Sequence, residues 1–189
     1  MRPEYVAKRK RKMRERRGNT FDWIESVVLA LVTCVLIFIF GVRVVGVEGT
    51  SMINTLENGD RILISNLFYE PEAGDIVVLR KLSFSKDPIV KRVIATEGQV
   101  VKMDFERGIV YVDDVALDEP YINERTYDPE DFVGPVTIPE GHVFVLGDNR
   151  NNSTDSRRAT IGTVDERYIM GKVIFRILPF DKIGAIYGS

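Results

Sequence analysis

The sequence is poor in two residues on which many exported domains and many proteases depend. Its 189 residues include one cysteine, Cys34, and one histidine, His142. A single cysteine cannot form an intramolecular disulfide, so the fold must be stabilised by its core alone. A single histidine with no cysteine near it argues against a metal centre. We expect no metal and no cofactor, and we interpret His142 as a turn or surface residue.

Charge is distributed unevenly along the chain. Residues 1–22 hold nine basic and three acidic residues, a net charge of +6, while the other 167 residues hold 17 basic and 25 acidic ones, a net charge of −8. A basic arm of this kind can bind nucleic acid. This arm is short and leads directly into an apolar run, so we expect no nucleic-acid partner and interpret it as a cytoplasmic flank of a membrane segment.

The apolar run extends from Ile24 to Val42. As a helix, its 19 residues would span about 28 Å, close to the roughly 30 Å hydrocarbon core of a bilayer. The alternative is a cleaved secretory signal, but the run exceeds the usual apolar length of such signals. Because basic residues stay on the cytoplasmic side, we predict a single-pass protein of the cell membrane. Its parts are a cytoplasmic arm (1–22), a transmembrane anchor (23–43) and an extracytoplasmic domain (44–189).

The extracytoplasmic part has the pattern of a β protein. Short runs rich in β-branched and aromatic residues alternate with turn signals such as Asn58-Gly59-Asp60, and no window after residue 45 keeps a helical period, although 164–170 could form one helical turn. We predict a mainly β fold, an antiparallel sheet domain behind one transmembrane helix. Residues 118–136 are predicted to be an irregular excursion. The predicted strands are 61–65, 76–79, 89–94, 100–103, 109–112, 143–146 and 172–178.

Ser51 is the first candidate for chemistry, although most serines in such turns are ordinary surface residues. It lies nine residues beyond the apolar run, which an extended chain covers in at most about 30 Å, so it should stay near the bilayer. Gly49 permits close approach of a substrate backbone to the Ser51 N–H, an oxyanion donor, and Met52 can line an adaptable apolar wall. With histidine nearly absent, a lysine is the expected base for this serine.

Lys91 is the candidate base. Neighbouring residues of a strand face opposite ways, so Lys91 shares its face with Ile89 and Val93 rather than with Arg92. If that face is buried, desolvation lowers the pKa of the amine below its free value of about 10.4. A neutral amine can accept the serine proton. The alternative is a solvent-facing lysine on an edge strand.

A polar loop over residues 147–157 completes the candidate site. Asp155 and Arg157 are two residues apart, so in extended chain they point the same way and can form an ion pair that fixes the loop. Ser153 can make a hydrogen bond that orients the lysine amine, the role of the third member of a catalytic triad.

Taken together, these features resemble a bacterial type I signal peptidase of the single-anchor form found in Gram-positive organisms. The resemblance runs from about residue 20 to the C-terminus and rests on several motifs in order. They are Ser51-Met52 with Thr55-Leu56, Gly59-Asp60-Arg61, Gly74-Asp75-Ile76-Val77-Val78, Lys91-Arg92-Val93-Ile94, and Gly147-Asp148-Asn149-Arg150 through Asp155-Ser156-Arg157.

The resemblance implies a membrane-bound serine endopeptidase that removes signal peptides from secreted preproteins. Ser51 would be the nucleophile, Lys91 the general base and Ser153 a hydrogen-bond partner of Lys91, with an Asp155–Arg157 ion pair supporting the site. The implied partners are preproteins with Ala-x-Ala-like cleavage sites and the lipid bilayer, on which an apolar surface of the domain would rest.

The chain departs from the family pattern in two places. Asn54 stands where the family has proline, and Ala95-Thr96-Glu97-Gly98-Gln99 replaces a typical Gly-Leu-Pro-Gly-Asp. Both departures spare the Ser–Lys pair and favour a narrowed substrate set, such as pilin or surface-protein precursors. The alternative hypothesis is a non-catalytic, membrane-anchored accessory for pilus or surface-protein assembly that keeps the peptidase fold.

Overall fold

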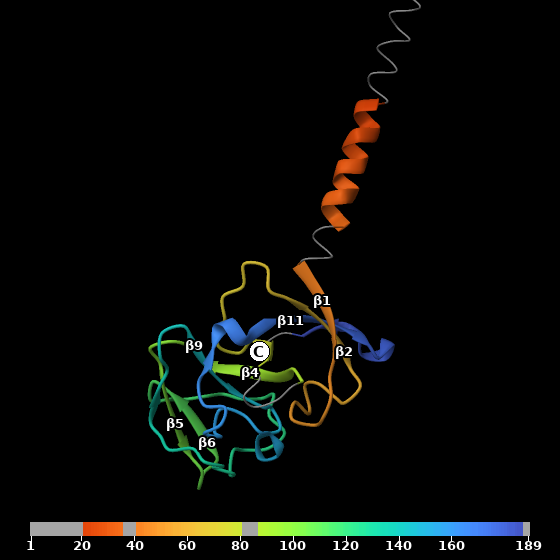
Figure 1. The fold of residues 1–189 in the computed structure, drawn as a ribbon. Coiled ribbons are helices and arrows are strands. Elements are labelled where there is room, and N and C mark those ends of the chain that lie inside the picture. Colours follow the sequence, from red (N-terminus) through yellow and green to blue (C-terminus); the bar gives the residue numbers. More distant parts are fainter. Residues whose placement is uncertain (1–20, 36–40, 81–86, 187–189) are drawn as a thin grey trace, which may run out of the picture. The chain divides into compact units, whose positions relative to one another are not determined.

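The computed structural model describes residues 21–35, 41–80 and 87–186. The chain divides into two compact units, Met1–Gly41 and Val42–Ser189. In the first unit residues 21–35 form a helix with exposed side chains, drawn red to orange in Figure 1. Within the described ranges, no helix combines the length and the apolar character that crossing a bilayer requires. Residues 1–20 of the predicted arm and 36–40 of the predicted anchor lie outside these ranges.

The second unit is built almost entirely of antiparallel strands, which confirms the mainly β prediction. All seven predicted strands are present within a residue or two at most ends, and 172–178 begins earlier, at Ile169. The predicted helical turn over 164–170 is a strand followed by a 3-10 turn, Glu166–Tyr168. The strands are β1 (Val42–Gly46), β2 (Arg61–Ser65), β3 (Ile76–Leu79), β4 (Ile89–Ala95), β5 (Val100–Asp104), β6 (Ile109–Val112), β7 (Val115–Ala116), β8 (Val136–Thr137), β9 (His142–Leu146), β10 (Val164–Asp165), β11 (Ile169–Leu178) and β12 (Gly184–Ala185).

These strands form two sheets. The larger has the order β1-β2-β11-β3-β4-β9-β10, with β12 also paired to β11, and the smaller has the order β7-β6-β5-β8. The first strand, β1, takes up Val42 and Arg43, the last two residues of the predicted anchor. Most of the predicted excursion, up to β8, has no regular structure. The smaller sheet lies beside the β4–β9 end of the larger one (Figure 1).

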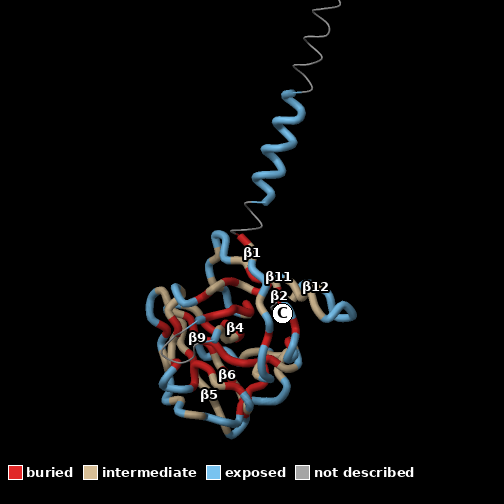
Figure 2. Tube along the Cα trace, turned by 45° about the vertical axis from the view of Figure 1, so that its right-hand side comes forward, coloured by how far each residue is buried: buried red, intermediate tan, exposed pale blue. Residues whose placement is uncertain are grey.

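The interior of the large sheet places β4 between two apolar layers. Ile64 and Val78 lie in one core cluster with Met52 and Leu56, and Val93 and Val145 lie in a second. A third cluster joins the two sheets through residues of β4, β5, β6 and β9. Both faces of β4 are therefore covered, and six of its seven residues are buried (Figure 2). A charged side chain on this strand must be desolvated whichever way it points.

Candidate active site

Ser51 lies in the connection between β1 and β2, and this connection is held at both ends. Its two limbs are joined by the Val47 N–H, which donates to Asp60 O at 2.8 Å. Met52, beside the serine, and Leu56, four residues later, are buried in the core and anchor the segment there. Gly49 has a φ of +90°, a conformation that favours glycine, and its N–H donates to Asn58 Oδ1 at 2.9 Å. These contacts fix the position of the half-buried Ser51.

Lys91 reaches Ser51 from the middle of the large sheet. Its Nζ donates to Ser51 Oγ at 2.8 Å and to Val90 O at 3.0 Å. The residue is only 4% exposed, and burial lowers the pKa of the Lys91 amine to about 8 against the opposing effects of Asp155 and Asp148. The cause is the desolvation of an ammonium between two apolar layers. At slightly alkaline pH a large fraction of this amine is neutral and able to accept the Ser51 proton.

Asp155 and Arg157 form a buried ion pair near Ser51 and Lys91. Arg157 Nε lies 2.9 Å from Asp155 Oδ1, and its Nη2 lies 2.9 Å from Oδ2, a two-bond geometry that fixes the orientation of the carboxylate. The same Asp155 Oδ2 accepts a hydrogen bond from the Gly147 N–H at 3.0 Å. The carboxylate thereby connects the end of β9 to the polar loop.

Ser153 also lies near Ser51, although its hydroxyl makes a different hydrogen bond from the predicted one. Its hydroxyl donates to Asp155 Oδ2 at 2.8 Å, whereas the hydrogen bonds described for Lys91 go to Ser51 and Val90. A Cβ placed on Gly147 would collide with the Ser153 side chain and lie 2.6 Å from Ser51 O. The loop therefore needs glycine at 147 to bring Ser153 against the Ser51 backbone.

The structure adds a second buried charge pair to which the sequence analysis assigned no role. Arg92 donates to Asp148 through Nε at 2.8 Å and Nη2 at 2.7 Å, and both side chains are essentially inaccessible to solvent. Asn149 follows Asp148 and holds the Ser51 segment directly, with its N–H on Ser51 O at 3.0 Å and its Nδ2 on Thr50 O at 3.0 Å. The available signal was a charged residue, Arg92, inside an apolar strand, and an acid, Asp148, two residues after the end of the buried strand β9.

A small cavity opens beside the Ser51–Lys91 pair. It measures about 60 Å³ and is lined by the end of β1, the Ser51 turn and the start of β4, with Val47, Met52 and Ile89 among its walls. A volume of this size takes a methyl-sized side chain and rejects a larger one unless the walls move. Among the described residues, no three or more metal-ligating side chains come together.

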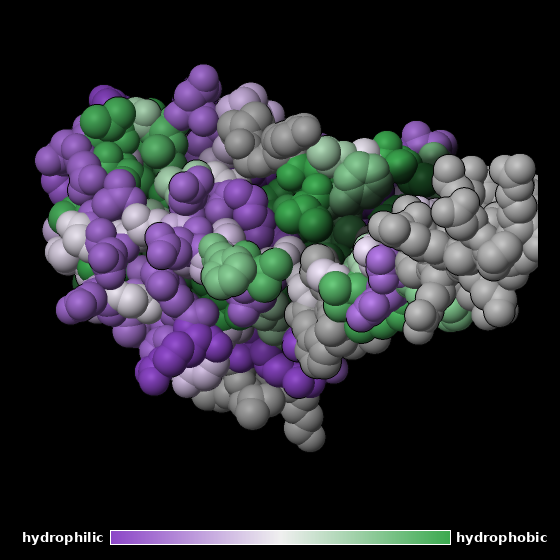
Figure 3. All heavy atoms as spheres, turned by 90° about the horizontal axis from the view of Figure 1, so that it is seen from above, coloured by the Kyte–Doolittle hydropathy of each residue, from purple (hydrophilic) through white to green (hydrophobic). Residues whose placement is uncertain are grey.

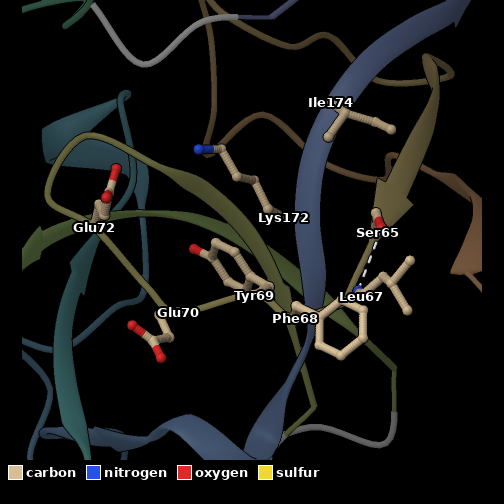
Figure 4. A pocket seen from close by; sticks show the side chains of 8 residues that line it. All are labelled: Ser65, Leu67, Phe68, Tyr69, Glu70, Glu72, Lys172 and Ile174. Carbon is tan, nitrogen blue, oxygen red and sulfur yellow. Dashed lines mark hydrogen bonds between the residues drawn. The ribbon is translucent and has the colours of Figure 1, made fainter.

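A larger, open pocket of about 440 Å³ shares no residue with that cavity (Figure 4). It lies over β2 and β11 at the start of the β2–β3 loop. Two of its lining residues contact the buried Asp75 carboxylate: Lys172 Nζ lies 2.6 Å from it, and Tyr69 donates its hydroxyl to it at 2.9 Å. Leu67 and Phe68 form an exposed apolar corner.

A serine hydroxyl bonded to a buried lysine amine, beside a small cavity, is the composition of a serine hydrolase site with a lysine base. The family model described as "Signal peptidase, peptidase S26" matches residues 20–178. This chain belongs to that signal peptidase family.

Curated relatives cover nearly the whole chain. Signal peptidase I of Bacillus licheniformis is 34% identical over 183 residues, which are 91% of this chain and 96% of the relative. Signal peptidase I T of Bacillus subtilis (strain 168) is 34% identical over 184 residues, 91% and 93% of the two chains. Among solved structures, a signal peptidase I from Enterococcus faecalis V583 matches with 30% identity and a TM-score of 0.46, over 55% of this chain and 97% of that one.

Proposed function

We propose that this protein is a signal peptidase I, a membrane-bound serine endopeptidase that removes N-terminal signal peptides from preproteins and cleaves after small residues. Membership of the signal peptidase family supports the reaction class. The observation that carries the assignment to residues is the 2.8 Å hydrogen bond between Lys91 Nζ and Ser51 Oγ, made by a lysine whose pKa burial lowers to about 8.

The proposed reaction begins with Ser51. Its Oγ attacks the scissile carbonyl while the neutral Lys91 amine takes the hydroxyl proton, and the Ser51 backbone N–H stabilises the oxyanion. The Lys91 ammonium then donates that proton to the leaving amine as the peptide C–N bond breaks. Lys91, neutral again, takes a proton from the water that hydrolyses the acyl-enzyme, and returns it to Ser51 Oγ.

Two buried carboxylates support this chemistry without taking part in bond making. Asp155, held by Arg157, and Asp148, held by Arg92, both favour the ammonium form of Lys91 and so stabilise the charge that appears on it during attack. Ser153 acts through Asp155, to which its hydroxyl donates. Arg157 and Ser153 are therefore positioning residues in this proposal.

The cavity supports a preference for preproteins with Ala-x-Ala-like cleavage sites. At about 60 Å³ beside Ser51, it suits alanine at the position before the cut. Gly49, whose backbone lines the same cavity, leaves room for an extended substrate to approach. The replacement of proline by Asn54 next to this turn remains the reason to test pilin and surface-protein precursors as dedicated substrates.

The membrane arrangement is part of the proposal: a cytoplasmic arm (1–22), a transmembrane anchor (23–43) and an extracytoplasmic catalytic domain (44–189). One feature of the domain supports contact with lipid. Val42, where the chain enters the sheet, pairs with Ser65, so the loop tip that follows, Leu67 and Phe68, lies at this same end. Phe68 is 96% exposed. In the space-filling view, which draws the helix of the first unit as well as the domain, apolar side chains gather in patches among polar ones (Figure 3).

The test is cleavage of an Ala-x-Ala preprotein by the full-length protein in detergent, with N-terminal sequencing of the product. We expect wild type to cut after the small residue, and Ser51→Ala and Lys91→Ala to be inactive. Lys102→Ala removes an exposed lysine of β5 and should keep full activity. If folded wild type cleaves neither this substrate nor pilin and surface-protein precursors, the non-catalytic accessory function replaces the proposal.

A further inference from the structure

Two arginines buried beside the candidate active site receive their outer contacts from the irregular segment 118–136. Arg92 belongs to β4, next to Lys91, and Arg150 opens the short 3-10 turn of the polar loop. Both are at most 1% exposed. Burial of a guanidinium costs free energy unless its N–H donors and its flat faces have partners. The residues that cover these two arginines therefore help to hold the site together.

Glu119 and Tyr121 supply that cover as a connected unit. Glu119 accepts hydrogen bonds from Arg150 Nη1 at 2.9 Å and from Nη2 at 2.5 Å, and its side chain is 5% exposed. The Tyr121 hydroxyl donates to Glu119 Oε1 at 3.1 Å, and the Tyr121 ring centroid lies 3.8 Å from the Cζ of Arg92. One carboxylate and one ring therefore hold both arginines at once, through charge-assisted hydrogen bonds and a cation–π contact.

From these arginines the contacts lead to the nucleophile in two steps. Arg150 Nε donates to Gly147 O at 3.1 Å, and Arg92 holds the Asp148 carboxylate. Next in the chain, Asn149 holds the Ser51 and Thr50 carbonyls. The irregular segment 118–136 also bonds directly to the residues that follow β9, since the Asn123 N–H donates to Asp148 O at 3.1 Å.

We propose that Glu119 and Tyr121 are positioning residues of the peptidase: together they hold residues 147–149, which follow β9, against the Ser51 turn and keep water away from Lys91. This inference rests on the proposed function. Neither residue lines the cavity beside Ser51, so their effect should fall on the chemical step rather than on substrate binding.

Loosening this cover should change the titration of the base in a definite direction. Burial is the main cause of the low pKa of Lys91. Among the charged groups that act on it, Asp155, Asp148 and Glu130 raise its pKa and Arg157 lowers it. If residues 147–149 move and water reaches Lys91, the desolvation of the Lys91 amine weakens and the pKa of that amine rises. The alkaline rise in activity then moves to higher pH.

The experiment measures kcat and KM of the full-length protein on an Ala-x-Ala preprotein between pH 6.5 and 10.5. For Glu119→Gln and Tyr121→Leu we expect kcat at pH 8 to fall about tenfold with KM within twofold of wild type, which corresponds to about 1.4 kcal/mol of barrier. The midpoint of the alkaline rise should move up by about half a pH unit or more. Tyr121→Phe keeps the ring over Arg92 and should lie between Tyr121→Leu and wild type.

Matched controls come from the same segment. Asp118→Asn removes an exposed neighbouring carboxylate, and Tyr127→Leu removes a tyrosine that is half exposed; both should behave as wild type. Near-UV circular dichroism and thermal unfolding establish whether each variant is folded. If Tyr121→Leu does not fold, the result for Glu119→Gln decides the outcome.

Unchanged kcat in folded Glu119→Gln and Tyr121→Leu would overturn the inference. So would a lower kcat with an unmoved pH midpoint, which indicates a merely structural role. Failure of the proposed function looks different, because wild type itself would then not cleave.

Discussion

Two lysines of the large sheet lie in one cross-strand row and have opposite environments. Lys91 on β4 stands opposite Val77 on β3, Val77 stands opposite Lys172 on β11, and Lys172 stands opposite Ser65 on β2. Residues directly opposite each other project from the same face, so both lysines share one face, two strands apart. The fold therefore offers the same backbone position twice and makes different use of it.

What separates them is water and a counter-ion. The Lys172 side chain is 36% exposed, borders the open pocket of about 440 Å³ and lies 2.6 Å from the Asp75 carboxylate (Figure 4). Lys91 is 4% exposed, borders a cavity of about 60 Å³ and has a hydroxyl and a carbonyl as the described acceptors of its amine. Burial lowers the pKa of the Lys91 amine to about 8, so this amine gives up its proton more easily than a free lysine does. The proposed catalytic lysine is thus the one beside the smaller cavity.

The largest expected effect is the difference in kcat/KM between variants at Lys91 and variants at Lys172. Lys91→Ala and Lys91→Arg should each lower kcat/KM on an Ala-x-Ala preprotein by about 10³-fold or more, the arginine because a guanidinium does not lose its proton in proteins. Lys172→Ala should stay within about threefold of wild type. Initial rates of the full-length protein in detergent give both numbers. Substantial activity of Lys91→Arg would remove Lys91 from its role as base.

The pH profile tests the same difference in the unmodified protein. With the pKa of Lys91 near 8, kcat/KM should rise about tenfold per pH unit below pH 8 and level off above it, because only the neutral amine accepts the Ser51 proton. Glu130→Gln removes a carboxylate that raises the Lys91 pKa, so its profile should move to lower pH. Lys172→Ala should leave the profile in place. A profile that is flat between pH 6.5 and 9 contradicts a lysine base.

The burial of Lys91 could be predicted from its neighbours, since Ile89 and Val93 mark its face of β4 as apolar. The burial of Arg92 carried the same signal, since Val90 and Ile94 mark its own face of β4 as apolar. Its partner could not be predicted in this way, because Asp148 lies 56 residues further along the chain. The Ser153 bond to Asp155 and the Glu119–Arg150 pair join residues whose geometry depends on loop conformation, which apolar periodicity does not describe. β1 was hidden because its valines continue the preceding apolar run.

The pKa of Lys91 also implies a pH-dependent stability. The folded pKa of about 8 lies below the unfolded value of 10.5, so between these values the unfolded chain binds more protons. The contribution of Lys91 to the free energy of unfolding should therefore rise with pH through this window, by up to about 3 kcal/mol. Urea unfolding of wild type and Lys91→Met at pH 7.5 and 10.5 isolates it, because the variant lacks this term.

Lys172→Met provides the control for that measurement. Its partly exposed pair with Asp75 should change stability by less than about 1 kcal/mol at either pH. If wild type and Lys91→Met keep a constant difference in unfolding free energy across the window, Lys91 is not held neutral by burial.

The smallest effect concerns the corner of the open pocket, where the proposed membrane contact puts Phe68. A bulky residue with φ of +51° and 96% exposure gains nothing from packing within the described chain, whereas insertion into lipid would bury its ring. In a Cys34→Ser background, a nitroxide label at Phe68→Cys should collide severalfold more with oxygen than with a water-soluble nickel complex in proteoliposomes. A label at Val133→Cys, 87% exposed on the excursion, should favour the nickel complex. Equal accessibility at both positions would place the β2–β3 loop in water, and the pocket above Lys172 with it.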